Sequence, residues 1–322
     1  DFTFMEENAK LFVNAPFVIA ENDADNSSAE YQAKETGNVC ATGSEKEIFT
    51  EIRNLVSILP ANNEDDMSYS ECEDDLNRIC TDIENCAGDT SIALSMISDD
   101  GFYMEMKKDY APEMVTAFIR LNGATVGCVA NRSEVYNAEG EKAETFDNVL
   151  SVRGCKKAAD FVKFCDAFEL PVLTLTNVKG YKATKCSEAN IAKAAASLTY
   201  AFANATVPKV NVVVGEAFGS AYLTMNSKST GADMVFAWPE SQIGMMDAKL
   251  AAKIMYADSD AATINEKAAE YAQLQSSALS AAKRGYVDDI VNPEDTRKRV
   301  IAAFEMLFTK REDRPDRKHG TV

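Results

Sequence analysis

The sequence is poor in the side chains that histidine-based catalysis requires. Its single histidine, His319, lies among the last four residues in a charged tail. A catalytic triad built on histidine and a multi-histidine metal site are therefore nearly excluded. If the chain is an enzyme, its acid–base group has to come from elsewhere.

Paired cysteine motifs and an excess of basic residues are also missing. No two cysteines form a Cys-x-x-Cys pair, so we interpret all of them as reduced core or surface thiols. Acidic residues number 51 and basic residues 33, and the net charge of −18 argues against nonspecific binding to nucleic acid or anionic membranes. The cysteines are Cys40, Cys72, Cys80, Cys86, Cys128, Cys155, Cys165 and Cys186.

Long apolar runs are the third absence. No stretch approaches the roughly 18–20 apolar residues of a membrane span, and the N-terminus lacks the order of a secretory signal. The cytoplasm is the default location. With 322 residues and 46% hydrophobic content, the chain can bury one large core or two smaller ones. Because Asp1 is not a natural initiator, we expect the chain to begin inside a longer protein.

The first 75 residues predict an incomplete unit followed by a linker. Residues 11–20 form an apolar, strand-like run, and residues 45–59 have the spacing of an amphipathic helix. The acidic, Pro-containing stretch 60–75 is typical of an exposed linker. The apolar face expected for the helix consists of Ile48, Ile52, Leu55, Val56 and Leu59.

From about residue 76, strands alternate with helices, which predicts an α/β fold with a mostly parallel sheet and helices packed outside. The Asn122-Gly123 pair is a strong hairpin signal between two apolar runs. Trp238-Pro239 is expected as core and turn, and Met245-Met246 as packing. The expected elements are strands 115–120, 125–130, 172–178 and 210–214, a helix following Gly154, a helix over 188–205 and a helix from Gly219.

Residues 206–248 are the most informative stretch. A buried strand runs through a tight turn into a helix that starts at Gly219-Ser220-Ala221. Free N–H groups at a helix N-terminus stabilise negative charge on a ligand oxygen. Ligand sites in such folds lie at the carboxyl ends of strands, where the turns 178–181 and 218–221 both fall. Serine is also a favoured N-cap, so the pattern by itself is most simply interpreted as an ordinary helix start.

Five ordered segments resemble the carboxyltransferase subunits of biotin-dependent acyl-CoA carboxylases and of sodium-pumping decarboxylases. Residues 11–63 further resemble the end of that family's first domain. The resemblance implies a crotonase-like (ClpP/crotonase) β-β-α superhelix domain, preceded by the tail end of a second such domain. It places a first-domain remnant with the acidic linker at 1–68 and the biotin-side domain at 69–322. The segments are 110–131, 156–181, 205–246, 284–297 and 317–320.

The resemblance also implies the reaction. A carboxyl group would move between biotin and a short-chain acyl-CoA of the propionyl/methylmalonyl, acetyl/malonyl or glutaconyl type. Carboxybiotin on a carrier would release carbon dioxide, and the biotin enolate would remove the α-proton of the thioester, so the cofactor acts as its own base. No metal is expected in this chain. The protein has to stabilise developing oxyanions with backbone amides.

The family's Gly-Gly-Ala-Tyr turn carries the site assignment. Its two hole-forming residues match Ser220 and Ala221, preceded by Gly219. Ser220 stands where the family has glycine, so its backbone must tolerate a β-carbon. Lys179 replaces a usual proline and Tyr181 a usual phenylalanine. The residues expected at the biotin and substrate pocket are Gly180, Tyr181, Tyr222 and Leu223.

The partners implied are a biotin carboxyl carrier protein, the first carboxyltransferase domain, acyl-CoA and further copies of the chain in a dimer or hexamer. Neither nucleic acid nor direct membrane insertion is expected, although the protein could sit peripherally on a membrane decarboxylase complex. Two alternatives stay open. The chain could be an assembly module that is inactive alone, or a crotonase-type hydratase or isomerase, for which an acid such as Glu216 would be tested as the base.

Overall fold

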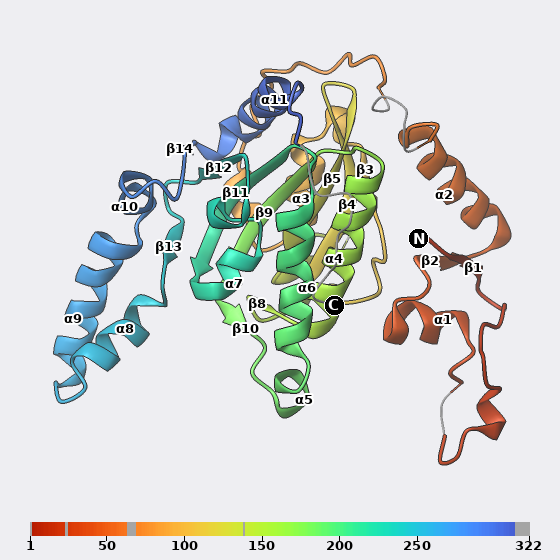
Figure 1. The fold of residues 1–322 in the computed structure, drawn as a ribbon, viewed down its shortest axis with the longest axis horizontal. Coiled ribbons are helices and arrows are strands. Elements are labelled where there is room, and N and C mark those ends of the chain that lie inside the picture. Colours follow the sequence, from red (N-terminus) through yellow and green to blue (C-terminus); the bar gives the residue numbers. More distant parts are fainter. Residues whose placement is uncertain (1, 23–24, 63–68, 138, 313–322) are drawn as a thin grey trace.

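The computed structural model describes residues 2–22, 25–62, 69–137 and 139–312. Its centre is an eight-stranded sheet in the order β14-β12-β11-β9-β5-β4-β3, with β13 paired to the far end of β11 (Figure 1). Strands β5, β9, β11, β12, β13 and β14 run parallel, and β4 and β3 extend the sheet as antiparallel strands. The strands are β3 (Tyr103–Glu105), β4 (Met114–Leu121), β5 (Ala124–Asn131), β9 (Val172–Val178), β11 (Lys209–Phe218), β12 (Met234–Ala237), β13 (Gln242–Gly244) and β14 (Asp289–Ile290).

Helices cover both faces of this sheet, as expected for apolar strands in a parallel arrangement. Neighbouring strand residues alternate between the two layers: Phe118 packs in the cluster with α4 and α6, and Ile119 packs in the cluster with α3 and α11. The α/β prediction is confirmed. The covering helices are α3 (Thr90–Ile97), α4 (Val152–Ala167), α6 (Ile191–Asn204) and α11 (Thr296–Leu307).

The hairpin predicted at Asn122-Gly123 is confirmed. Both residues have positive φ, 51° and 78°, as a two-residue primed turn requires. A β-carbon on Gly123 would lie 1.9 Å from the carbonyl oxygen of Ser70, and the Ser70 amide donates to the Gly123 carbonyl at 2.9 Å. Glycine is therefore needed both for its φ and for this close approach.

Residues 69–75 are packed on the body, so this part of the expected linker is not a free connection. Asp74 lies 3.3 Å from the buried guanidinium of Arg297, which also pairs with Asp99 at 2.7 Å. Arg297 donates further to the carbonyl of Ile97 at 2.6 Å. The exposure that polar composition predicted is found at alternate residues, 69, 71, 73 and 75, whereas opposite charges from three distant segments hold Asp74 against the body. Residues 63–68 of the expected linker, and the predicted boundary at 68/69, fall in or beside the stretch outside the described residues.

The N-terminal segment flanks the body on one side (Figure 1). It contains a parallel pair, β1 (Phe4–Glu6) and β2 (Ala41–Gly43), a short helix α1 (Ala29–Tyr31), and α2 (Glu45–Ile58). The strand expected over 11–20 is wrong. Only a 3₁₀ turn at Pro16–Val18 forms there, because proline lacks an amide and β1 pairs with β2 instead.

The helix expected over 45–59 forms, with one change on its apolar face. Leu55 and Ile58 are buried in the same cluster as α4, whereas Val56 is 69% exposed. Leu55 and Ile58 are three positions apart, so the two share a face of the helix that Val56 does not. A capping box formed by Ser44 and Glu47 begins the helix.

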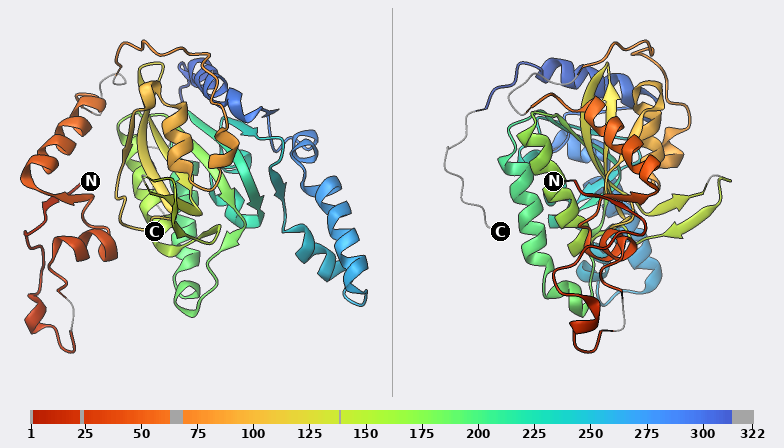
Figure 2. Two further views of the ribbon diagram at one scale, coloured as in Figure 1. Left: turned by 180° about the vertical axis from the view of Figure 1, so that it is seen from behind. Right: turned by 90° about the vertical axis from the view of Figure 1, so that its right-hand side faces the viewer.

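The opposite flank is a run of helices, α8 (Ala248–Met255), α9 (Ala261–Tyr271) and α10 (Ala278–Lys283), in which α8 and α9 project from the body (Figure 2). Met245, at the entry to this flank, is 78% exposed, so the packing expected for it is wrong. Trp238 is buried as expected, and its indole Nε1 donates to Thr296 Oγ1 at 3.0 Å. All eight cysteines are unpaired.

Some predicted boundaries shift. The helix expected from Gly154 begins at Val152, where the Ser151 hydroxyl accepts from the Gly154 amide. The helix expected over 188–205 is divided into α5 (Lys185–Glu188) and α6. In the charged tail, Lys310 pairs with Asp233, and His319 lies outside the described part. The remaining strands are β6 (Glu134–Tyr136), β7 (Lys142–Thr145), β8 (Val149–Leu150) and β10 (Gly180–Tyr181).

Candidate functional site

The turn between β11 and α7 (Gly219–Thr224) presents backbone amides that no side chain caps. Phe218 is the N-cap residue, and it makes no side-chain cap hydrogen bond. The first amides of a helix, here those of Gly219, Ser220 and Ala221, have no acceptor within the helix. Ser220 is the second helical residue, so the serine N-cap reading is wrong for this helix.

The backbone of this turn explains why glycine precedes serine. Gly219 has a φ of +59°, and a β-carbon on it would lie 3.0 Å from the carbonyl oxygen of Met245. Ser220 is not among the residues with positive φ, so its β-carbon is accommodated without strain, as expected. Ser220 is exposed and Ala221 is buried, which places the amide pair at the edge of the body.

The second predicted turn is held beside the first. The Lys179 amide donates to the Asn148 carbonyl at 2.9 Å, and β10 pairs with β8. The Tyr181 hydroxyl lies 3.0 Å from Thr224 Oγ1 at the end of α7. The structure thus brings Gly180 and Tyr181 next to the helix that carries Ser220 and Ala221 (Figure 1).

The two remaining predicted pocket residues, Tyr222 and Leu223, lie in different environments. Tyr222 is buried in an apolar cluster with Val213 and Ala278, and its hydroxyl has no hydrogen-bond partner among the described residues. Burial, with a smaller contribution from Asp288, raises the pKa of Tyr222 to about 12. Its side chain therefore supports the turn from the core. Leu223 faces outward and is 44% exposed.

A polar cluster that the sequence reasoning missed lies at the carboxyl ends of the strands. Asn148 Nδ2 is 3.3 Å from Asn177 Oδ1 and 3.5 Å from Glu216 Oε2. The Glu216 amide donates to Asn177 Oδ1 at 3.0 Å, and the Asn177 amide donates to Asn131 Oδ1 at 3.1 Å. The available signal was the asparagine that ends or nearly ends each of the apolar strands β5 and β9.

A second feature that the sequence reasoning missed is a chain of hydroxyls under α7. Thr224 Oγ1 donates to the Ser220 carbonyl at 3.0 Å and lies 3.1 Å from Thr199 Oγ1, which also lies 2.9 Å from the Ala195 carbonyl. A threonine four residues after the serine of a helix start is the pattern that could have revealed it.

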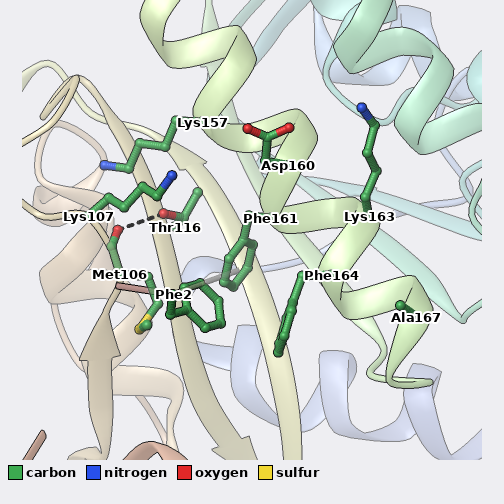
Figure 3. A pocket seen from close by; sticks show the side chains of 10 residues that line it. All are labelled: Phe2, Met106, Lys107, Thr116, Lys157, Asp160, Phe161, Lys163, Phe164 and Ala167. Atoms are coloured by element: carbon green, nitrogen blue, oxygen red, sulfur yellow. Dashed lines mark hydrogen bonds between the residues drawn. The ribbon is translucent and has the colours of Figure 1, made fainter. Parts of the chain in front are cut away.

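A partly open pocket of about 280 Å³ lies elsewhere, between α4, the N-terminal residues and the β3–β4 edge (Figure 3). None of the predicted site residues is among the described residues that line it. Lys157, on its wall, donates to the Tyr110 carbonyl at 2.8 Å, and burial lowers its pKa to about 8. The lining residues are Phe2, Met106, Lys107, Thr116, Lys157, Asp160, Phe161, Lys163, Phe164 and Ala167.

Within the described residues, no cluster of histidine, cysteine and acidic side chains is arranged to hold a metal ion. In the same part of the chain, no helix is both long and apolar enough to cross a bilayer.

The sequence is similar to known proteins over nearly its whole length. The family model of the carboxyl transferase domain matches residues 1–322. Methylmalonyl-CoA decarboxylase subunit alpha of Propionigenium modestum is 34% identical, covering 100% of this chain and 65% of its own length. The methylmalonyl-CoA carboxyltransferase 12S subunit of Propionibacterium freudenreichii is also 34% identical, covering 99% of this chain and 63% of its own.

Solved structures show the same similarity. The transcarboxylase 12S hexamer with methylmalonyl-coenzyme A and methylmalonic acid bound has a TM-score of 0.91 at 35% identity, covering 100% of this chain and 64% of that one. The chain spans less than two thirds of the length of these relatives. Its fold is the crotonase-like fold expected from the sequence. The chain belongs to the carboxyl transferase domain family.

Proposed function

We propose that this chain is the biotin-facing part of a carboxyltransferase that acts on a short-chain acyl-CoA. The observation that carries the proposal is the uncapped amide pair of Ser220 and Ala221 in a chain of the carboxyl transferase family. Two convergent N–H donors at a helix start suit an oxygen that gains negative charge during the reaction.

The residues present suit the ureido oxygen of biotin. Bound carboxybiotin supplies the carboxyl group and, after its loss, a basic nitrogen. The chain contributes the amides of Ser220 and Ala221, which donate to that oxygen, and Gly219, which makes the turn possible. Removing one donor of such a hole typically costs about 2.7–4 kcal/mol of barrier.

We propose an acyl group of the propionyl/methylmalonyl type. The relatives at 34–36% identity are named for methylmalonyl-CoA or propionyl-CoA. Exposed Leu223, one residue beyond Tyr222 on α7, offers an apolar contact near the amide pair. Turnover of methylmalonyl-CoA should exceed that of malonyl-CoA and glutaconyl-CoA, and a clear preference for either of the others would contradict this assignment.

We further propose that the protein works as a homo-oligomer and receives biotin from a carrier protein. Large apolar side chains of residues 11–19, as well as of α8 and α10, are exposed on the two flanks, and contiguous apolar surface of this kind usually marks an interface. The transcarboxylase relative is described as a hexamer. Residues 1–68 would belong with a first domain, so this chain should transfer little carboxyl group until that domain is supplied.

The test uses the complete enzyme, assayed for transfer from a methylmalonyl-CoA donor to free biotin. Ser220→Gly keeps the amide and should retain most activity. Ser220→Pro removes it and should lose at least about a hundredfold, equivalent to roughly 2.7 kcal/mol of barrier. A hundredfold loss in folded Ser220→Gly would show that the serine hydroxyl is needed and would contradict the amide proposal.

Assays of the same enzyme preparation distinguish a carboxyltransferase from a hydratase or isomerase. Such an enzyme needs a side-chain base, ignores biotin and should lose activity in Glu216→Gln. The carboxyltransferase should keep its activity in Glu216→Gln and lose it without biotin. Crotonyl-CoA hydration that disappears in that variant would overturn the proposal.

A further inference from the structure

Thr224 contacts the peptide group that carries one of the proposed oxyanion donors. Its hydroxyl donates to the Ser220 carbonyl at 3.0 Å. That carbonyl and the Ala221 N–H belong to one planar peptide unit and point in opposite directions. A bond that holds the carbonyl end therefore also fixes the direction of the N–H end.

The hydrogen bond from Thr224 to the Ser220 carbonyl also affects the strength of the Ala221 N–H as a donor. Hydrogen bonds in series polarise one another in a low-dielectric environment, so a donor at the carbonyl makes the N–H a better donor. Thr224 is only 4% exposed, so water does not readily replace its hydroxyl. Because α7 has six residues, few helical hydrogen bonds hold its first turn in place.

Thr224 is itself held by two other elements. The Tyr181 hydroxyl on β10 lies 3.0 Å from Thr224 Oγ1. Thr199 Oγ1 on α6 lies 3.1 Å from the same atom and shares its single proton with the Ala195 carbonyl at 2.9 Å. When Thr224 gives its proton to the Ser220 carbonyl, the Tyr181 hydroxyl becomes a donor to Thr224. A continuous path then runs from the second turn, through Thr224, to the Ser220–Ala221 peptide.

We propose that Tyr181 and Thr224 are positioning residues, which align and polarise the Ala221 N–H through the Ser220 carbonyl. This inference rests on the proposed function for its effect on the reaction. The Tyr181 hydroxyl bonds to the threonine that reaches the amide pair.

The test compares four variants of the complete enzyme: Thr224→Val, Thr224→Ser, Tyr181→Phe and the double variant Tyr181→Phe/Thr224→Val. Thr224→Val should lower kcat about tenfold and leave KM for the acyl-CoA within about twofold, since the transition state is affected more than ground-state binding. Thr224→Ser keeps the hydroxyl and should recover most of the rate. Tyr181→Phe should lower kcat about threefold.

The double variant tests the order of action. Because Tyr181 acts through Thr224, the double variant should be no slower than Thr224→Val alone. Losses that multiply would show two independent effects and overturn the proposed path. A loss in Thr224→Ser as large as that in Thr224→Val would show that the hydroxyl alone does not support the rate and would overturn the positioning role.

Two control variants match these changes. Thr230→Val removes a hydroxyl that donates to the Leu223 carbonyl, which lies on α7 but outside the Ser220–Ala221 peptide. Tyr136→Phe removes a tyrosine hydroxyl bonded to Glu134 on the exposed β6–β7 hairpin. Both should keep kcat within about twofold of the unmodified enzyme.

Hydrogen exchange separates this inference from the proposed function. Amides of α7 should exchange faster in Thr224→Val and Tyr181→Phe and return to normal in Thr224→Ser, whether or not the enzyme transfers carboxyl groups. Unchanged exchange would overturn the positioning role even in an active carboxyltransferase. Altered exchange in a protein without any transfer activity would reject the function and keep the positioning of the peptide. Altered exchange with unchanged kcat in an active enzyme would overturn the catalytic effect.

Discussion

The central sheet and the two flanks differ in how they bury apolar side chains. In the sheet, residues such as Val115, Leu173 and Val210 are fully buried between two helical layers. On the flanks, Phe17 is 89% exposed and Ile254 is 62% exposed. Burial stabilises by about 25 cal/mol per Å² of apolar surface, so the body holds itself together and the flanks gain most when another surface covers them.

Ion pairs also differ between the two regions, since the body contains buried pairs and the N-terminal flank contains exposed ones. Arg297 is buried among Asp74 and Asp99, and Arg132 pairs with Glu105 at 3.1 Å in the interior. Ion pairs on the N-terminal flank, such as that between Lys34 and Glu30, are exposed to water. Removing one partner of a buried pair leaves an uncompensated charge, whereas an exposed pair is worth about 0–1 kcal/mol.

The largest expected effect is therefore Asp99→Ala. It leaves the buried Arg297 guanidinium short of its nearest carboxylate and should lower the free energy of unfolding by about 3–5 kcal/mol in urea titration. Arg299 lies on α11, as Arg297 does. Arg299→Ala breaks an exposed pair with Asp289 and should lower the free energy of unfolding by under about 1 kcal/mol. Similar losses in both variants would contradict the contrast between buried and exposed charges.

Lys157 should give the body an unusual pH dependence. Burial holds its folded-state pKa near 8, below the ordinary 10.5, so between these values the unfolded chain binds more protons. Stability of the wild type should therefore rise with pH over this window, by up to about 3 kcal/mol relative to Lys157→Met. Unfolding curves at pH 7 to 10.5 check this, and a difference between the two proteins that stays constant with pH would refute it.

Gly123 in the body and Gly140 on an exposed hairpin have the same φ of +78°, so substituting each with alanine compares the two environments. Gly123→Ala places a β-carbon against the Ser70 carbonyl, whereas a β-carbon on Gly140 meets no atom within 4 Å. Gly140→Ala should cost only the conformational strain of about 1 kcal/mol. Gly123→Ala should cost at least about 2 kcal/mol more in thermal or urea unfolding. Equal costs would mean that the packing of residues 69–75 on the hairpin adds no stability.

The smallest change in stability is expected on the flank. Ile254→Lys exposes nothing new in the isolated chain and should change the free energy of unfolding by less than about 0.5 kcal/mol. In the complete enzyme it should weaken the oligomer, as measured by sedimentation. Ile92→Lys, at a partly exposed position on α3 of the body, is the control and should leave the oligomer intact. An unchanged oligomer in Ile254→Lys would remove the flank from the proposed interface.

Much of the fold was predictable where local pattern and burial agree. The hairpin at Asn122-Gly123, the strand β9 and the helix α2 follow from turn chemistry and periodicity. The run 11–20 was mispredicted because an apolar stretch indicates a strand only when a neighbouring strand pairs with it. Val56 and Met245 were expected to pack but are exposed, because no described segment covers them.

The sequence by itself determined the α/β order and the turn between β11 and α7, because turns and apolar periodicity are local properties of the chain. It determined the family through its resemblance to known sequences. Only the tertiary structure decided that Tyr181 meets Thr224 and that Arg297 meets Asp74 and Asp99. It also placed Tyr222 in the core and left Leu223 at the surface. These outcomes depend on how segments far apart in the chain pack, and one sequence carries no local signal for contacts of that kind.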